Sequence, residues 1–172
     1  MKVVQLANAE FLPHVCQLAA EGHTVAIRAK GNSMRPFLES GRDVAMLVRA
    51  DSYRVGDVVL AEIEPGHYVL HRIDRIRTPQ GQAVKGACSD PAALVTLRGD
   101  GNVCGTESCR LQDLRCTASA FKRKGKVWKT NSRFWRIYSR LWPALLPLRR
   151  YLLALYRLLW LHELPERWRK KQ

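Results

Sequence analysis

Ser33 stands in a segment, GNSMRPFL at 31–38, whose residue types suit a nucleophile at the end of a strand. Gly31 permits a tight backbone turn, and Pro36 prevents the segment from continuing as a strand. A serine on such a turn can project its hydroxyl into a cleft, where backbone N–H groups can receive an oxyanion. The same pattern also suits an ordinary turn or cap serine, so a catalytic role requires partners elsewhere in the chain.

His71 and Asp100 are the candidate partners of Ser33. His71 lies in the strand-like run YVLHRI at 68–73. A histidine, with an ordinary pKa of about 6.5, can take a proton from a serine hydroxyl near neutral pH. Asp100 lies in LRGDGN at 97–102, a strand end that runs into a turn, where its carboxylate could either hold the turn or orient His71. An isolated strand histidine, by contrast, would be a structural residue.

Short β-rich runs separated by turns that contain Gly, Asp and Pro must position these residues. The runs cover residues 24–29, 44–48, 58–62, 68–76, 83–85, 94–97 and 116–121. This spacing predicts a mainly β, α+β fold, either a twisted sheet or a small coiled β-barrel. A helix over 8–20, capped by Asn8 and stopped by Gly22, is expected at the edge of the sheet. We expect residues 1–121 to form this core domain.

Together these segments resemble the serine peptidase superfamily that unites type I signal peptidases with LexA-like self-cleaving repressors. The motif Gly-x-Ser-Met-x-Pro is matched at 31–36, a Gly-Asp pair follows at 56–57, and the Gly-Asp-Asn box is matched at 99–102 with one extra glycine. The pair His71-Arg72 resembles the general-base position of the histidine-base branch of this superfamily, rather than that of the lysine-base branch. The resemblance covers residues 31–102. It implies a cofactor-free serine endopeptidase that cleaves a precursor or leader peptide, or the chain itself, by a Ser33–His71 mechanism.

The third catalytic member is the point at which the chain departs from the family. Histidine-type enzymes carry a further aspartate shortly after the Gly-Asp-Asn box, and here Glu107 is the acidic residue in that stretch. An earlier Gly-Asp pair of the family appears as Gly41-Arg42-Asp43, with one residue inserted. We expect Asp100 to be the third member, and a Ser–His dyad without it is the alternative.

Charge divides the chain into two parts. Residues 1–121 carry 14 Lys/Arg and 13 Asp/Glu, whereas residues 122–172 carry 15 Lys/Arg and only Glu163 and Glu166 as acidic residues. The sequence predicts that residues 122–172 form a basic, amphipathic helical tail, joined to the core through a basic hinge at 121–129. Its helices are expected over 132–141 and 144–161, with Pro143 and Pro147 breaking the path between them.

The tail predicts an anionic partner. Arg149, Arg150 and Arg157 argue against a membrane span over 141–161 and fall on one side of a helix whose other side is rich in leucine. Leucines, cations and tryptophans together favour helices that lie in the surface of an anionic membrane. Packing on the core or on a partner subunit is the alternative, and nucleic acid is less favoured because a nucleic-acid groove needs less leucine. The competing interpretation of the whole chain is a non-catalytic module that uses the tail for such binding.

The five cysteines are an odd number, which favours reduced thiols and a cytoplasmic location, with peripheral attachment to the cytoplasmic face of a membrane through the tail. The spacing of Cys104, Cys109 and Cys116 does not match a zinc ribbon, so no metal is expected. Residues 1–10 lack a basic region followed by an apolar run, so neither a signal peptide nor a transmembrane anchor is expected. A helix-turn-helix domain like that of the repressors is not expected either.

Overall fold

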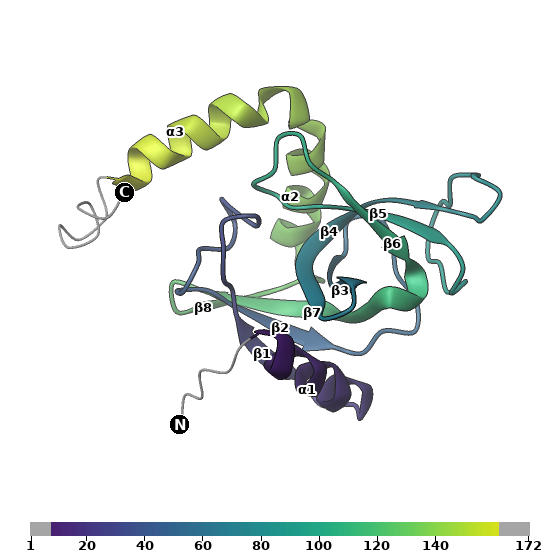
Figure 1. Ribbon diagram of the computed structural model, residues 1–172. Helices are drawn as coiled ribbons and strands as arrows, with labels where there is room; N and C mark the ends of the chain where they lie inside the picture. Colours follow the sequence, from purple (N-terminus) through teal and green to yellow (C-terminus); the bar gives the residue numbers. More distant parts are fainter. Residues whose placement is uncertain (1–7, 162–172) are drawn as a thin grey trace.

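The computed structural model describes the backbone of residues 8–161 and the side chains of residues 11–159 (Figure 1). The helices are α1 (Asn8–Ala20), α2 (Arg133–Ala144) and α3 (Arg149–Leu161), with short 3-10 helices η1 (Leu111–Asp113) and η2 (Leu146–Leu148). The strands are β1 (Val25–Arg28), β2 (Val44–Val48), β3 (Val58–Glu64), β4 (His67–Arg77), β5 (Leu94–Arg98), β6 (Glu107–Arg110), β7 (Leu114–Arg123) and β8 (Lys126–Lys129).

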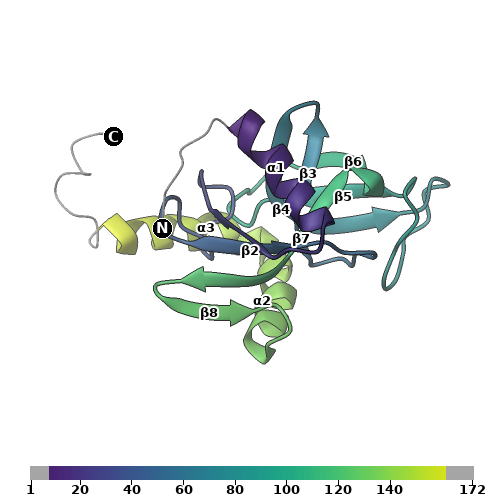
Figure 2. The ribbon, with the colours of Figure 1, turned by 90° about the horizontal axis from the view of Figure 1, so that it is seen from below.

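The strands form one antiparallel sheet in the order β1-β2-β7-β3-β4-β5-β6, and β8 also pairs with β7. The mainly β, α+β prediction is therefore confirmed. Within the described residues, β1 and β6 stand at the two ends of this order and do not pair with each other, so the sheet is open rather than a closed barrel. Figure 2 shows α1 lying across the sheet, where it contacts β7 and β4.

Two segments differ from their sequence-based assignment. Residues 83–85, expected as a strand, make only an isolated bridge between Arg77 and Ala83. Residues 121–129, expected as a hinge, form the β7–β8 hairpin. Its two turn residues, Lys124 and Gly125, have φ values of 46° and 81°, which match the left-handed turn that suits the twist of paired strands. The many lysines of this segment are typical of a linker. Residues 126–129 nevertheless form a strand because their backbone pairs with β7.

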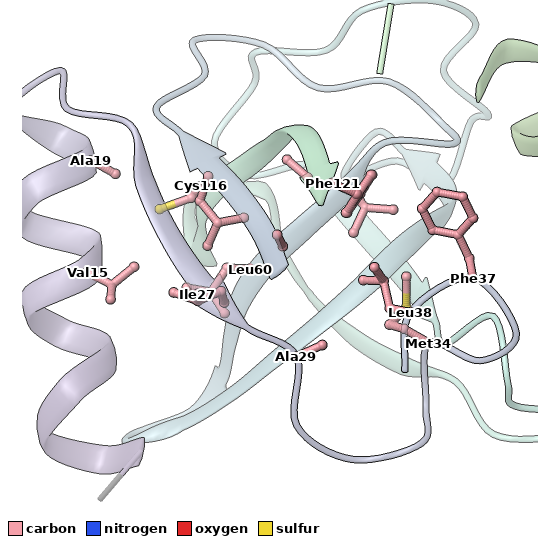
Figure 3. Close-up of a cluster of buried hydrophobic side chains, with 14 of the residues drawn as sticks. Val15, Ala19, Ile27, Ala29, Met34, Phe37, Leu38, Leu60, Cys116 and Phe121 are labelled. Carbon is pink, nitrogen blue, oxygen red and sulfur yellow. The ribbon is translucent and has the colours of Figure 1, made fainter. Parts of the chain in front are cut away.

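Apolar side chains are buried on both faces of the sheet. Val59 and Leu60, neighbours on β3, point to opposite faces and are 0% and 2% exposed. Leu60 belongs to a core cluster that α1 covers with Val15 and Ala19 (Figure 3), and Val59 belongs to a second cluster under β5 and η1. The strands that carry the candidate site are therefore fixed from both sides.

The two C-terminal helices expected from the sequence are present as α2 and α3. Ser132 caps α2 by accepting a hydrogen bond from the N–H of Trp135, and Trp135 and Trp142 bury the same face of the helix. Pro143 lies in the last turn of α2, and η2 links it to α3. Among the described residues, no helix is long and apolar enough to cross a membrane.

Candidate active site

Ser33 lies on the loop between β1 and β2, just beyond a turn at Gly31 with a φ of +88°. Glycine adopts this conformation at little cost. Met34, Phe37 and Leu38 follow Ser33, are at most 4% exposed, and anchor the loop in the core (Figure 3). Ser33 itself is half-buried, and its hydroxyl has no hydrogen-bond partner among the described residues. The loop is thus fixed while the hydroxyl remains available.

His71 lies on β4, is 4% exposed, and has its Nδ1 atom 2.8 Å from Oε2 of Glu107, the first residue of β6. A carboxylate can only accept a hydrogen bond, so Nδ1 carries the proton and donates it. In the neutral ring, Nε2 is then the unprotonated acceptor. This is the tautomer that a general base requires.

Gly99 lies between the Ser33 loop and the ring of His71. A Cβ added to Gly99 would be 2.4 Å from the carbonyl oxygen of Ser33 and 3.1 Å from Nε2 of His71. The N–H of Gly101 donates to the same Ser33 carbonyl at 2.7 Å, and a Cβ there would be 2.6 Å from the carbonyl oxygen of Asn32. Close approach therefore requires glycine at both positions, which explains the extra glycine of the box. The turn after β5 brings the Ser33 loop and Nε2 of His71 together.

Ser33 and His71 line the same pocket, which has a volume of about 180 Å³. Its walls come from α1, from β1 and the residues that follow it, from Leu60 on β3, and from the first half of β4. Much of this lining is apolar and includes Phe11, Leu12, Ile27, Ala29, Leu60 and Leu70. The candidate nucleophile and base thus share a small pocket that offers an apolar surface to a ligand.

The backbone around Ser33 also carries free donors. The N–H groups of Ser33 and Met34 have no acceptor among the described residues, whereas the N–H of Arg35 donates to the carbonyl of Asn32 at 3.1 Å. Two adjacent unpaired N–H groups beside a serine hydroxyl have the chemistry of an oxyanion-binding site.

Asp100 does not orient His71, and that part of the sequence-based expectation is wrong. Its two carboxylate oxygens accept hydrogen bonds from Nε and Nη2 of Arg72 at 2.8 and 2.7 Å, and one of them also accepts from the hydroxyl of Tyr138 at 2.9 Å. Arg72 follows His71 on β4, so the two side chains point to opposite faces of the strand. Asp100 lies on the face of Arg72, and Glu107 is the carboxylate on the face of His71.

The pair formed by Arg72 and Asp100 is fully enclosed. Their side chains are 4% and 2% exposed, and the guanidinium also donates to the carbonyl of Gly56 and to the hydroxyl of Ser139. Burial alone would lower the pKa of Arg72, but the carboxylate of Asp100 raises it above its ordinary value. The guanidinium carbon also lies 4.9 Å from the ring centre of Trp135. The pair therefore joins β4, the turn after β5 and α2.

The C-terminal helices close the back of the site. Nε1 of Trp142 donates to the carbonyl oxygen of Asp100 at 2.9 Å, and Nη1 of Arg149 donates to that of Asn102 at 3.0 Å. Arg149 is 2% exposed, and burial lowers its pKa. The expectation that Arg149 lies on a polar face with Arg150 and Arg157 is therefore wrong, because Arg149 faces the protein.

Helix α3 also reaches the loop that carries Ser33. The hydroxyl of Tyr156 donates to the carboxylate of Glu39, which is 1% exposed and pairs with Arg35 at 3.1 Å. Both loops that meet at Gly99, the loop of Ser33 and the turn of Asp100, are thus held by hydrogen bonds to the C-terminal helices.

No match was found for this chain among family models, curated proteins or solved structures. Among the described residues, no group of three or more His, Cys, Asp or Glu side chains could hold a metal ion. From the geometry described above, the candidate site consists of Ser33, His71 and Glu107, with Gly99 between the first two.

Sequence reasoning missed the residues that support this site from α2 and α3. Trp135, Tyr138 and Trp142 follow one another at intervals of three and four residues, which is typical of one helix face packed on a core. That spacing could have shown that α2 docks on the sheet. No sequence signal distinguishes the buried Arg149 from the exposed arginines around it.

Proposed function

We propose that this chain is a serine endopeptidase in which Ser33 is the nucleophile, His71 the general base and Glu107 the residue that holds the imidazole ring. One observation gives the proposal its main support. Residues 33, 71 and 107, far apart in the sequence, converge so that Nδ1 of His71 is held by a carboxylate while Nε2 lies beside the Ser33 loop. The resemblance of residues 31–102 to the histidine-base signal peptidases agrees with this assignment.

The reaction follows from these positions. The Oγ atom of Ser33 attacks the scissile carbonyl carbon while Nε2 of His71 accepts the hydroxyl proton. The N–H groups of Ser33 and Met34 donate to the oxyanion that forms. When the tetrahedral intermediate collapses, Nε2 gives its proton to the leaving amine, and an acyl-serine remains. Water then attacks the acyl-serine with His71 again as base, which releases the acid and restores Ser33.

Glu107 orients the imidazole ring of His71 in this sequence of steps. Its carboxylate accepts the Nδ1 proton at 2.8 Å, so it fixes the ring orientation and lies beside the imidazolium that forms when Nε2 is protonated. Among the described residues the Ser33 hydroxyl has no hydrogen-bond partner, and in the proposed reaction its contact with Nε2 of His71 forms when substrate binds.

The proposed substrate is a precursor or leader peptide, or a segment of the chain itself, cleaved on the cytoplasmic side of a membrane. The apolar part of the pocket that Ser33 and His71 line supports a peptide that presents small apolar side chains next to the scissile bond.

A serine-reactive fluorophosphonate probe tests the proposal directly. We expect the probe to label the wild-type protein at Ser33, as located by peptide mass spectrometry, and labelling to be lost in Ser33→Ala. The rate should fall about 10²–10⁴-fold in His71→Ala, because no base then activates the hydroxyl. Ser89→Ala is the matched control, since Ser89 is exposed and outside the pocket, and it should label like the wild type.

Two results would overturn the proposal. Absence of labelling between about pH 6 and 9 would exclude an activated Ser33 and favour a non-catalytic binding module. An unchanged labelling rate in His71→Ala would exclude His71 as the base, even if Ser33 reacts.

A further inference from the structure

The face of α3 that points away from the protein is apolar and exposed. Tyr151, Leu155, Leu158 and Leu159 are 64%, 53%, 60% and 61% exposed. At 100° per residue, these four side chains fall within one arc of about 100°. Figure 1 shows α3 extending from the α2 end of the molecule along its upper side, away from the sheet. Several large apolar side chains gathered on one exposed helix face mark an interaction surface.

The orientation of this face is fixed by the opposite side of the helix. Arg149 and Leu153 are 2% and 7% exposed, and Tyr156 donates its hydroxyl hydrogen bond to Glu39. These three residues follow one another at intervals of four and three positions and so form the inner face of α3. Rotation of α3 that would bury its leucines would break these contacts, so the apolar face stays exposed.

Exposed apolar residues continue beyond α3. Ile137 and Leu141 lie one turn apart on α2 and are 58% and 57% exposed, and Leu148 in η2 is 54% exposed. The inner face of α2 is occupied by Trp135 and Trp142, so these side chains also point away from the core. Exposed apolar side chains therefore occur on α2 and η2 as well as on α3.

Positive charge borders the apolar face, and within α3 no acidic residue interrupts it. Arg150 and Arg157 are exposed and lie within about 20° of each other on the helix, next to the arc of apolar residues. Residues 149–161 contain no acidic residue, and residues 122–172 carry 15 Lys/Arg against two Glu. An apolar helix face with a cationic border matches the acyl chains and phosphates of an anionic lipid surface.

We propose that the outer face of α3, together with Ile137, Leu141 and Leu148, is a docking surface for an anionic membrane. Its leucines enter the acyl boundary of the lipid layer, and Arg150 and Arg157 contact lipid phosphates. This interaction is independent of the proposed peptidase reaction.

Two other occupants fit the charges less well. A second copy of the chain, paired through α3, would bring two sets of Arg150 and Arg157 together, and like charges at an interface oppose association. Nucleic acid would match the arginines but would leave the leucines in water, because leucine neither stacks on bases nor binds phosphate.

Flotation of the full chain with vesicles tests the proposal. We expect binding to vesicles that contain phosphatidylglycerol, weaker binding to pure phosphatidylcholine, and a decrease in binding at high salt. Leu155→Ser/Leu158→Ser should lower the partition coefficient on phosphatidylglycerol vesicles about tenfold or more, because two largely exposed leucines no longer enter the lipid. Arg150→Gln/Arg157→Gln should lower it about tenfold, and only on the anionic vesicles.

Matched controls separate this surface from general stickiness. Val55→Ser/Leu94→Ser removes two side chains that are 53% and 48% exposed elsewhere on the protein, and it should leave the partition coefficient unchanged. Arg75→Gln/Arg77→Gln on β4 is the corresponding charge control. If circular dichroism shows that the double leucine variant is unfolded, Leu158→Gln alone should still lower binding about threefold.

Several outcomes would overturn the proposal. They are absence of wild-type binding to phosphatidylglycerol vesicles, and equal losses in the Leu155→Ser/Leu158→Ser variant and its control. Salt-sensitive binding to duplex DNA without vesicle binding would assign the surface to nucleic acid. A concentration-dependent dimer that light scattering detects in the wild type and not in the leucine variant would assign it to a second copy.

Discussion

Arg72→Met removes a buried guanidinium while keeping much of the side-chain volume. The carboxylate of Asp100, 1% exposed, then loses two hydrogen bonds of 2.8 and 2.7 Å. Among the described residues it keeps only the Tyr138 hydroxyl as a side-chain donor. The carbonyl of Gly56 and the hydroxyl of Ser139 lose their contacts with the guanidinium as well.

The expected cost is that of leaving a buried charge without its partner, about 3–5 kcal/mol of unfolding free energy. This is a large part of the roughly 5–15 kcal/mol that keeps a typical domain folded. With a urea m-value of about 2 kcal/mol/M, the unfolding midpoint should fall by about 1.5–2.5 M. Most of the loss should return in Arg72→Met/Asp100→Asn, because the second substitution removes the uncompensated charge and leaves an amide that still accepts from Tyr138.

Urea unfolding followed by circular dichroism measures these free energies for the two variants, the wild type and a control. Arg75→Met is the control on the same strand, since the Arg75 side chain is 63% exposed and its nearest carboxylate oxygen, on Asp74, is 3.8 Å away. The control should change stability by less than about 0.5 kcal/mol. A loss below about 1 kcal/mol in Arg72→Met would refute the reasoning. A double variant no more stable than the single one would show that packing, rather than the orphaned carboxylate, accounts for the cost.

Three further substitutions probe the site and its supports. Glu107→Gln should slow probe labelling of Ser33 about 10²–10⁴-fold at nearly unchanged stability, because an amide can donate to Nδ1 of His71 and so favour the wrong tautomer. A labelling rate that changes by less than about threefold would show that the proposed Ser33–His71 dyad does not depend on Glu107. Gly99→Ala should abolish labelling and cost about 1–3 kcal/mol in urea unfolding, since its Cβ would meet backbone 2.4 Å away, whereas Gly105→Ala, with nothing within 4 Å, should be neutral. For Asp43→Asn the relevant quantity is the pKa of Asp43. Burial raises this pKa, but hydrogen bonds from the Arg42 guanidinium and the Glu39 N–H lower it, and it lies below its ordinary value. As the pH falls, Asp43 is therefore protonated in the unfolded chain before it is protonated in the folded protein. The stability advantage of wild type over Asp43→Asn in urea unfolding should be complete above about pH 4 and shrink as the pH falls. An advantage that grew in acid would contradict this prediction.

Local patterns in the sequence were sufficient to predict helix α1 and the elements that carry Ser33 and His71. Helix α1 was predicted with the bounds it has, because a cap at Asn8, a stop at Gly22 and apolar residues at helical spacing agree. The strand of His71 alternates clearly enough to identify it. The loop of Ser33 was identified by Gly31 and Pro36, whose backbone preferences are local properties of the residues.

Features that depend on pairing between distant segments could not be predicted in this way. Strand β6, with the sequence ESCR, has no apolar alternation, and it is a strand because its backbone pairs with β5, with Glu107 opposite Leu97. That register sets the side of the sheet on which Glu107 lies, and so its contact with His71. Strand register therefore decides whether Asp100 or Glu107 contacts His71, and strand register cannot be read from the spacing of residues along the sequence.

The C-terminal helices show why the candidate catalytic residues cannot be separated from residues 130–161. The family resemblance ends at residue 102, yet the carbonyl oxygens of Asp100 and Asn102 accept hydrogen bonds from Trp142 and Arg149. Without residues beyond 130, the buried carbonyl of Asp100, the half-buried carbonyl of Asn102 and the carboxylate of Asp100 would lose donors. A buried polar group without a partner costs about 1–3 kcal/mol. The same turn holds the Ser33 carbonyl through the N–H of Gly101. The inner faces of α2 and α3 therefore help to set the position of Ser33, while their outer faces remain free for the proposed membrane contact.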